Sequence, residues 1–305
     1  MTASKPKYLS ASVKQRLINY AEKSRTDFQV VLAQYGFERL LYRLSQSRHA
    51  KQFTIKGALM FWVWAGDQYR PTRDLDLGAI KQHTVIQIKE IFQSICMVPV
   101  GDDGLVFDAD SVKAETIRED TEYGGIRVNL QAKLGKSKIP IQVDIGFGDA
   151  ITPKALIERF PALLDFPAPE LAMYTKETAI AEKYETIVRR GIINSRMKDY
   201  YDIWVLSQNF PFDGDVLTNA IKATFHRRKT ALPSGVPDGL TEEFIRDRSK
   251  QAQWTSFTYR TRLKSSPGDL KDVVETIRKF LVPVSLAALR HETYKKIWKA
   301  GASWR

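Results

Sequence analysis

The stretch Ile139-Pro140-Ile141-Gln142-Val143-Asp144-Ile145-Gly146-Phe147 decides the fold class, because an apolar side chain stands at every second position. Successive side chains of a β-strand point to opposite faces, so this spacing predicts a strand with one buried face. Gln142 and Asp144 then lie on the other face. A half-buried strand needs partner strands, and candidates for them stand earlier in the chain.

Shorter strand patterns and helical patterns alternate before this stretch. Strands are predicted at residues 53–56, 74–80, 112–118 and 126–132, with a turn at Glu122-Tyr123-Gly124-Gly125. Apolar residues recur at helical spacing in the first 50 residues, from Ala58 to Trp64 and after His83-Thr84. This order predicts a small mixed sheet behind a helical prelude.

The second half of the chain has a helical pattern. The Pro-rich segment from Leu163 to Glu170 indicates a boundary. Beyond it, Thr175 is expected to cap a helix that ends at Gly191, and Asn194-Ser195 to cap another that ends before Pro211. We therefore expect an α+β fold with a mixed β-sheet core in residues 1–165 and a basic, mainly α-helical lobe in residues 166–305.

Composition excludes several classes of protein. The 305 residues are 43% hydrophobic and 27% charged, which excludes a disordered tail and a collagen-like fibre. The single cysteine, Cys96, stands in an apolar run, so we expect a buried bystander in a reducing compartment. No export signal is visible, and the longest apolar stretch, Ala58 to Ala65, is shorter than the roughly 20 residues that span a bilayer. These features predict a cytoplasmic protein without a membrane partner.

Positive charge is concentrated near the C-terminus. The formal net charge is +12, and residues 220–305 alone hold 18 Lys and Arg against 8 Asp and Glu. Such an excess favours polyanionic partners. Aromatic residues are interleaved with these charges, as RNA binding needs: Phe225, Trp254, Phe257, Tyr259, Trp298 and Trp304. The alternative is a solvated surface that aids solubility.

Three carboxylates stand on predicted strands. Asp74 and Asp76 are two residues apart in Arg73-Asp74-Leu75-Asp76-Leu77, so both point to one face. Adjacent carboxylates repel each other unless a cation lies between them, and Mg²⁺ prefers oxygen ligands. Asp144 is a feasible third ligand. The alternatives for Asp144 are a solvated sheet face or a salt bridge to Arg127.

Basic residues and a glycine turn suggest contacts to phosphate. Lys56-Gly57-Ala58 ends the first strand, where backbone N–H groups can approach an anion, although a tight strand-to-helix turn explains it equally well. Lys176 and Lys183 lie near one stripe of a predicted helix, either as phosphate ligands or as solvated lysines.

The helix that follows carries charges of both signs. Arg196, Asp199 and Asp202 recur every three residues, so they share a face, and Lys198 is four residues before Asp202. This face is either solvated and self-paired or one side of a two-lobed cleft. Serine hydrolase, zinc and Walker A patterns are absent from the sequence.

Five motifs in order resemble a known family. They are Lys56-Gly57-Ala58, Arg70-Pro71-Thr72-Arg73-Asp74-Leu75-Asp76-Leu77, Gln142 to Asp149, Glu177 to Lys183 and Asn194 to Asp202. Together they resemble the AbiEii/AbiGii toxin family of nucleotidyltransferases, within the polymerase-β-like superfamily. The resemblance implies a bilobed nucleotidyltransferase fold and Mg²⁺-dependent transfer of a nucleoside monophosphate from an NTP, with Mn²⁺ as an alternative ion. Family members are toxins of toxin–antitoxin or phage-defence pairs, and some modify tRNA ends.

The resemblance also assigns residues. Asp74, Asp76 and Asp144 would bind metal, Lys183 would hold nucleotide phosphates and Asp199 would complete the catalytic set. Lys56, Gly57, Ala58, Arg196 and Lys198 would join Lys183 in binding the nucleotide. Ala58 departs from the serine that the superfamily often has, which leaves only a backbone amide there. We expect an NTP substrate, an RNA or tRNA acceptor and a winged-helix antitoxin as partners. The alternatives are a non-catalytic RNA-binding module and a transferase for small molecules.

Overall fold

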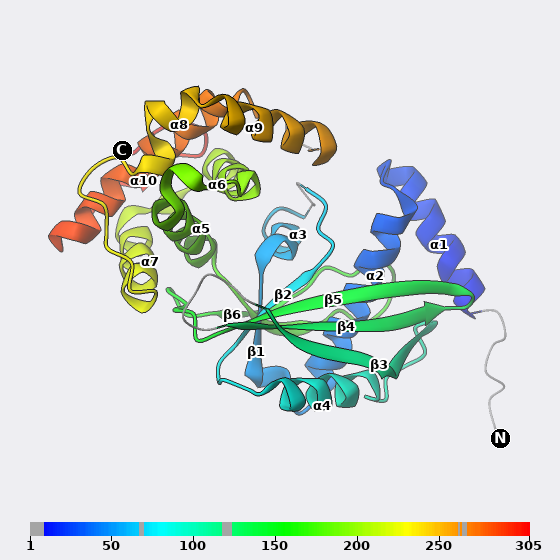
Figure 1. Ribbon diagram of the computed structural model, residues 1–305. Coiled ribbons are helices and arrows are strands. Elements are labelled where there is room, and N and C mark those ends of the chain that lie inside the picture. Colours follow the sequence, from blue (N-terminus) through cyan, green and yellow to red (C-terminus); the bar gives the residue numbers. More distant parts are fainter. Residues whose placement is uncertain (1–8, 67–69, 118–123, 262, 264–266) are drawn as a thin grey trace, which may run out of the picture. The chain divides into compact units, whose positions relative to one another are not determined.

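The computed structural model describes residues 9–66, 70–117, 124–261, 263 and 267–305 (Figure 1). The chain divides into two compact units by packing. The first comprises residues 1–68, 72–148 and 157–173, and the second comprises residues 69–71, 149–156 and 174–305. The predicted domain boundary at residue 165 remains a prediction, because packing does not show which parts fold separately. None of the described helices is long and apolar enough to cross a membrane.

The first unit is a mixed sheet with helices. Its helices are α1 (Leu9–Ser24), α2 (Phe28–Gln46), α3 (Met60–Ala65) and α4 (Val85–Cys96). Its strands are β1 (Phe53–Lys56), β2 (Leu75–Ala79), β3 (Leu105–Ile117), β4 (Gly125–Leu134), β5 (Ser137–Phe147), β6 (Leu156–Arg159) and β7 (Glu170–Met173). The strand order is β3-β4-β5-β2-β1-β7-β6. The pairs β2–β5 and β1–β7 are parallel, whereas β1–β2, β3–β4 and β4–β5 are antiparallel.

The alternation of side chains along β5 determines which face of the sheet is buried. Its apolar side chains, from Ile139 to Phe147, are buried, whereas Gln142 and Asp144 on the other face are half-buried. Gly36 lets α2 approach the apolar face, since a Cβ at this position would lie 3.0 Å from Ile139. Helix α4 begins after Thr84, as predicted, and its first turn has a capping box formed by Thr84 and Gln87. One face of the sheet is therefore packed and the other is available for polar side chains.

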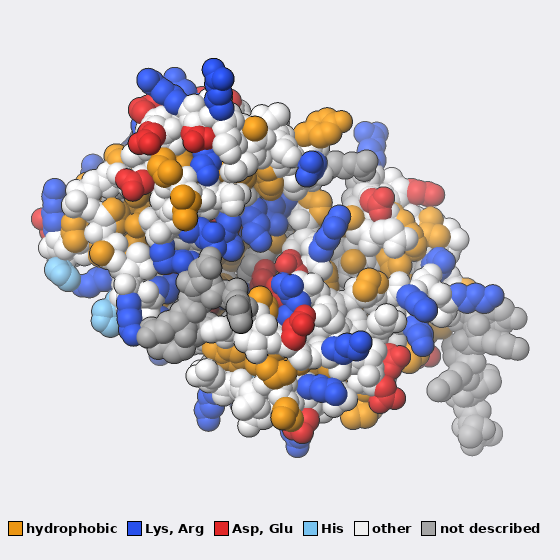
Figure 2. Space-filling model, in the orientation of Figure 1, with side chains coloured by type: hydrophobic (Ala, Val, Ile, Leu, Met, Phe, Trp, Pro, Cys, Tyr) orange, Lys and Arg blue, Asp and Glu red, His pale blue; other side chains and the backbone are white. Residues whose placement is uncertain are grey.

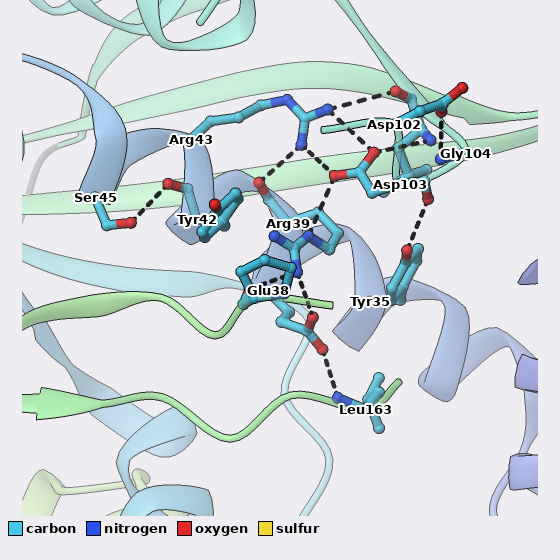
Figure 3. A network of polar contacts seen from close by, with 12 residues as sticks. Tyr35, Glu38, Arg39, Tyr42, Arg43, Ser45, Asp102, Asp103, Gly104 and Leu163 are labelled. Carbon is cyan, nitrogen blue, oxygen red and sulfur yellow. Dashed lines mark hydrogen bonds and ion pairs between the residues drawn. The ribbon is translucent and has the colours of Figure 1, made fainter. Parts of the chain in front are cut away.

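A buried ionic network lies beside the sheet, on α2 (Figure 3). Arg43 donates two hydrogen bonds to Asp103, at 2.7 and 3.1 Å, and Arg39 donates one at 3.2 Å. Glu38 accepts from Arg39 and from the backbone N–H of Leu163, the latter at 2.7 Å. Burial raises the pKa of Glu38 to about 7, although both donors oppose the shift. The network joins α2 to the predicted boundary segment, which is packed into the first unit.

The second unit is mainly helical. It contains α5 (Lys176–Arg190), α6 (Met197–Asn209), α7 (Gly214–Arg227), α8 (Glu242–Arg246), α9 (Arg248–Thr261) and α10 (Leu270–Arg290), with the short strands β8 (Phe212–Asp213) and β9 (Ile297–Trp298). Thr175 caps α5 as expected. The predicted cap of α6 is wrong in detail, because Arg196 is the N-cap residue and Asn194 instead accepts the N–H of Arg196 at 3.0 Å.

Two further sequence interpretations need correction or completion. Phe225, Trp254 and Trp298 are at most 4% exposed, so the prediction that they are interleaved for base stacking is wrong. They pack in the core of the second unit, where Trp298 donates to the carbonyl of Ser207 at 2.7 Å. Residues 122 and 123 of the predicted turn at 122–125 lie outside the described residues. Cys96 is buried and free, as expected, and burial raises the pKa of its thiol to about 12.

Candidate functional site

A row of charged side chains crosses the open face of the sheet. Residues paired in register share a face of a sheet. Lys56 on β1 is paired with Asp76 on β2, Asp76 with Asp144 on β5, and Asp144 with Arg127 on β4. Glu115 on β3 is paired with Arg127 and extends the row. Two carboxylates therefore lie side by side in the centre, with a cation on each side.

Asp74 completes a group of three carboxylates. It precedes β2 by one residue and lies on the same face as Asp76. One carboxylate oxygen from each of Asp74, Asp76 and Asp144 lies within 4.8 Å of the other two, and all three residues are half-buried. The hydroxyl of Thr72 donates to Asp74 Oδ1 at 2.5 Å and fixes its orientation. Figure 2 shows Asp and Glu side chains gathered over this part of the sheet. The structure thus brings together the three residues that the sequence proposes as metal ligands.

Gly57 allows the backbone to approach this group closely. Its φ is +75°, and a Cβ at this position would lie 1.9 Å from Asp76 Oδ2. Any other residue would displace the carboxylate and would also strain the backbone. Ala58, directly after it, is 4% exposed, so its methyl group is packed rather than presented to a ligand. Glycine is therefore required at residue 57 because the side chain of Asp76 lies directly beside it.

Arg127 balances part of the negative charge. Its Nε and Nη2 donate to the two oxygens of Asp144 at 2.8 and 2.7 Å. The salt bridge considered as an alternative for Asp144 is therefore confirmed, and it coexists with the three-carboxylate group. The hydrogen bond to Asp144 is the main cause of a raised pKa of Arg127, to which Asp74 also contributes. Three carboxylates and one guanidinium leave a net charge that a single dication neutralises.

A second polar cluster lies within the helical unit. Lys183 on α5 contacts both buried carboxylates of α6, with its Nζ 3.0 Å from Asp199 and 2.8 Å from Asp202. Arg196 Nε donates to Asp199 at 2.7 Å. Arg70 binds Asp202 through two N–H groups at 2.7 and 2.8 Å. Asp199 and Asp202 are each 1% exposed, so these carboxylates are not solvated, and they pair with Lys183 and Arg70 as well as with Arg196.

The pKa values in this cluster follow from burial and pairing. Burial opposes the charged form of Lys183, but attraction to Asp202 and Asp199 more than offsets it and raises the pKa of the lysine. Burial also opposes ionisation of Asp199 and Asp202. Lys183 together with Arg196 nevertheless lowers the pKa of Asp199, and Arg70 together with Lys183 lowers that of Asp202. All members of the cluster are therefore ionised at neutral pH.

The remaining predicted residues have separate positions. Lys198 does not pair with Asp202, contrary to the expected spacing, because Arg70 and Lys183 occupy that carboxylate. Lys176 lies over the ring of Phe210, with its Nζ 5.1 Å from the centre of the ring. Lys198 and Arg196 both line a groove of the helical unit. Figure 2 shows Lys and Arg side chains gathered over the part of this unit that contains α5 and α6.

Sequence reasoning missed two partners. Arg70 is 132 residues from Asp202, and nothing local in the turn that contains it indicates a buried ion pair. Arg228, after α7, forms ion pairs with Asp149, Glu182 and Glu185 at 3.1, 3.4 and 2.8 Å. Attraction to Glu182 and Asp149 exceeds the opposing effect of burial and raises the pKa of Arg228. The motif Gly146-Phe147-Gly148-Asp149 thus ends in an ion pair that fixes α5.

Comparison with known proteins identifies the family. The model of the nucleotidyltransferase AbiEii toxins, described as belonging to type IV toxin–antitoxin systems, matches residues 39–276. The chain belongs to this family. It is therefore a nucleotidyltransferase of a toxin–antitoxin family, and the predicted α+β fold, with a mixed sheet and a mainly helical C-terminal part, is confirmed. The match includes all three strand carboxylates and the Lys183 cluster.

Solved structures and curated proteins add little to this identification. JHP933 from Helicobacter pylori has a TM-score of 0.45 and 14% identity, over 83% of this chain and 89% of that one. An antigenic nucleotidyltransferase-like protein from Paracoccidioides brasiliensis has a TM-score of 0.32 and 11% identity, over 89% of this chain and 94% of that one. No curated protein matches the sequence. Structural similarities this low do not indicate which residues form the site.

Proposed function

We propose that this protein transfers a nucleoside monophosphate from an NTP to an acceptor hydroxyl in a reaction that depends on Mg²⁺. The observation that carries the proposal is the group formed by Asp74, Asp76 and Asp144, whose oxygens lie within 4.8 Å of one another on one face of the sheet. The acceptor in this proposal is an RNA such as a tRNA end, and the protein acts in the cytoplasm as the toxin of a toxin–antitoxin or phage-defence pair.

The carboxylate group fits a hard dication. Mg²⁺ binds oxygen ligands at about 2.0–2.1 Å, so ligand oxygens on opposite sides of one ion are about 4 Å apart. The observed spread of 4.8 Å needs only a small inward movement of the side chains. Gln142 Nε2 also donates to both oxygens of Asp144, at 3.3 and 3.4 Å. An ionised carboxylate has about four acceptor positions, so an ion at Asp144 would replace this long shared bond while the bond to Arg127 stays. Mn²⁺ has the same preference for oxygen and would serve as a substitute.

When bound, such an ion would polarise the phosphate and offset the charge that develops during transfer. The residues of the chain have their own tasks. Asp76 and Asp144 are held in register by their strands, and Thr72 holds Asp74 in place, so the ligands are oriented before any ion arrives. Lys56, Gly57 and Ala58 would contribute the backbone N–H groups of the turn and one ammonium group to a phosphate.

Lys183 is proposed to bind phosphate in the helical unit. Two of its three N–H donors are used by Asp199 and Asp202, and the third remains for a ligand. In this arrangement Asp199 positions the ammonium group. Arg196, at the start of the same helix as Asp199, would add positive charge for a nucleotide. This assignment supports a role of the cluster in substrate binding as well as in stability.

The test is transfer of label from each of four α-³²P-labelled NTPs to total tRNA in the presence of Mg²⁺. We expect transfer from at least one NTP by the wild-type chain and loss of at least about 100-fold in Asp76→Asn, since removal of a charge-stabilising group typically has this effect. Asp110→Asn is the matched control, because Asp110 is an exposed carboxylate on β3. Absence of transfer from all four NTPs, or equal transfer by both variants, would refute the proposal.

Two other outcomes would distinguish the remaining functions. A non-catalytic module would bind tRNA but not Mg²⁺–NTP in isothermal titration, and Ala58, which offers no hydroxyl to phosphate, is the residue that favours it. A small-molecule transferase would label an added hydroxyl compound but not RNA. A cognate winged-helix antitoxin is part of the proposal, and co-expression with the product of a neighbouring gene tests whether it suppresses toxicity.

A further inference from the structure

An open groove lies within the helical unit, between the start of α6 and helix α9. It has a volume of about 790 Å³. Its lining consists of Arg70, Pro71, Ser195, Arg196, Met197, Lys198, Ser249, Ala252, Gln253, Ser256, Phe257, Arg260 and Thr261. Four of these residues are cationic and none is acidic, within the part of the chain that the structure describes. The groove is thus a cationic surface with hydroxyl groups and one aromatic ring.

The positive charge of the groove is only partly neutralised. Arg70 and Arg196 are paired with Asp202 and Asp199, which also hold Lys183, so three cations share two carboxylates. Lys198 and Arg260 are exposed and have no ion-pair partner among the described residues. Helix α9 itself contains no Asp or Glu in its sequence. The groove therefore has a net positive charge that is not balanced by the residues around it.

Uncharged polar side chains complete the lining of the groove. Gln253 and Ser249 both line it, and Gln253 Nε2 donates to Ser249 Oγ at 3.2 Å. Ser195, Ser256 and Thr261 add hydroxyl groups. The groove therefore offers hydrogen-bonding groups as well as positive charge.

Aromatic side chains accompany the cations on α9. Phe257 lines the groove and is half-buried against Tyr201 and Trp254. Aromatic rings beside cations form the stacking platforms of proteins that bind single-stranded nucleic acid. Tyr259, two residues later on the helix, is 87% exposed but is not one of the residues that line the groove. Phe257 is therefore the ring that the groove presents beside Arg260.

We propose that the groove between α6 and α9 binds a single-stranded segment of the RNA acceptor. Lys198 and Arg260 would contact backbone phosphates, and the ring of Phe257 would contact a base. An open groove suits a strand that passes through it, whereas sites for single small molecules usually enclose most of the ligand. The inference rests on the proposed function, to which it adds the place where the acceptor binds.

The experiment measures binding, not transfer. A fluorescein-labelled 12-nucleotide single-stranded RNA is titrated with the full chain, and its anisotropy is followed between 50 and 200 mM salt. The test variant is the double substitution Lys198→Gln with Arg260→Gln. The control is Lys222→Gln with Lys279→Gln, which removes the same charge from exposed positions on α7 and α10. Isothermal titration with each Mg²⁺–NTP is run on the same three proteins.

We expect the test variant to bind RNA at least about 10-fold more weakly, with a salt slope reduced by about 1.4, or about 0.7 for each lost phosphate contact. The control should retain wild-type affinity within about twofold. Tyr259→Ala should retain wild-type affinity within about twofold as well, because Tyr259 is exposed but does not line the groove. Circular dichroism confirms that each variant is folded, since all the replaced side chains are exposed.

The outcomes separate this proposal from the proposed function. Equal weakening in the test and control variants would overturn the groove assignment, because net charge alone would then explain binding. A loss of NTP affinity in the test variant without a change in RNA affinity would overturn it too, since the groove would hold the donor nucleotide. If the groove variants lose RNA binding but the wild-type chain labels no acceptor, the groove stands and the proposed transfer fails.

Discussion

Substitution of Gly57 by alanine tests whether backbone approach positions Asp76. At this residue φ is +75°, and the added Cβ would lie 1.9 Å from Asp76 Oδ2. Contacts of a Cβ below 3.0 Å are essentially not observed, so the carboxylate would have to move by about 1 Å. Gly66 provides a matched control in the same unit. Its φ is +65°, but no atom lies within 4 Å of an added Cβ.

Both alanine variants should lose stability, but only Gly57→Ala should lose affinity for metal. Alanine in a left-handed conformation costs about 1–2 kcal/mol, so both variants should lose stability to a similar extent, about 2–8 °C in melting temperature for a unit of this size. Only Gly57→Ala displaces a proposed ligand. At a metal concentration of 100 times Kd, binding stabilises the wild-type protein by about 2.7 kcal/mol. A 10-fold weaker site would reduce this gain to about 1.4 kcal/mol.

The assay is thermal unfolding with and without Mg²⁺ or Mn²⁺. We predict that metal raises the melting temperature of Gly66→Ala as much as that of the wild-type chain, and that of Gly57→Ala by about half as much or less. Equal metal-induced shifts in the two variants would refute the reasoning, because the position of Asp76 would then not matter for metal binding.

Further predictions concern the buried charges. Lys183→Met leaves Asp199 and Asp202 without their shared cation and should destabilise the helical unit by about 3–5 kcal/mol. Lys222→Met, on the surface, should change the stability by less than about 0.5 kcal/mol. Chemical unfolding, together with hydrogen exchange of α5 and α6, measures the change in stability of both variants. Because the pKa of Asp199 is lowered, its ionised form stabilises the folded protein above the unfolded pKa of about 3.9, and this contribution is lost as pH falls below that value. The free energy of unfolding of Asp199→Asn should therefore fall less steeply with decreasing pH than that of the wild-type chain. The pKa of Glu38 is raised from 4.5 to about 7, so the neutral carboxyl stabilises the first unit below pH 4.5 and about 3 kcal/mol is lost as pH rises to 7. Carbon NMR of the Glu38 carboxyl between pH 4 and 9 checks the sign, and a midpoint at or below 4.5 would contradict it.

Local patterns predicted five of the seven strands of the sheet, but missed β6, β7 and the first part of β3. The alternation from Ile139 to Phe147 identified β5, and the spacing of Asp74 and Asp76 placed both on one face. Their meeting with Asp144 follows from the register of β2 and β5, which apolar periodicity leaves undetermined. The sequence therefore predicted which carboxylates to consider, and the order of the strands brings them together.

Charges that pair across long separations could not be predicted in the same way. Arg39 and Arg43 stand within the apolar stripe of α2, and their partner Asp103 is 60 residues or more away. Spacing alone predicts a solvated charged face on α6, whereas in the structure Asp199 and Asp202 on this face are buried and contact Lys183 and Arg70. The C-terminal aromatics illustrate the converse error, because a sequence does not distinguish an aromatic residue in the core from one on a binding surface.

The central claim is that Asp74, Asp76 and Asp144 together hold a divalent ion, and electron paramagnetic resonance of Mn²⁺ tests it most directly. Titration of the full chain with Mn²⁺ should show bound ion in the wild-type protein and in Asp110→Asn. Asp76→Asn and Asp144→Asn should each bind Mn²⁺ at least about 10-fold more weakly, since each removes a charged oxygen ligand. Wild-type affinity for Mn²⁺ in both ligand variants would contradict the account.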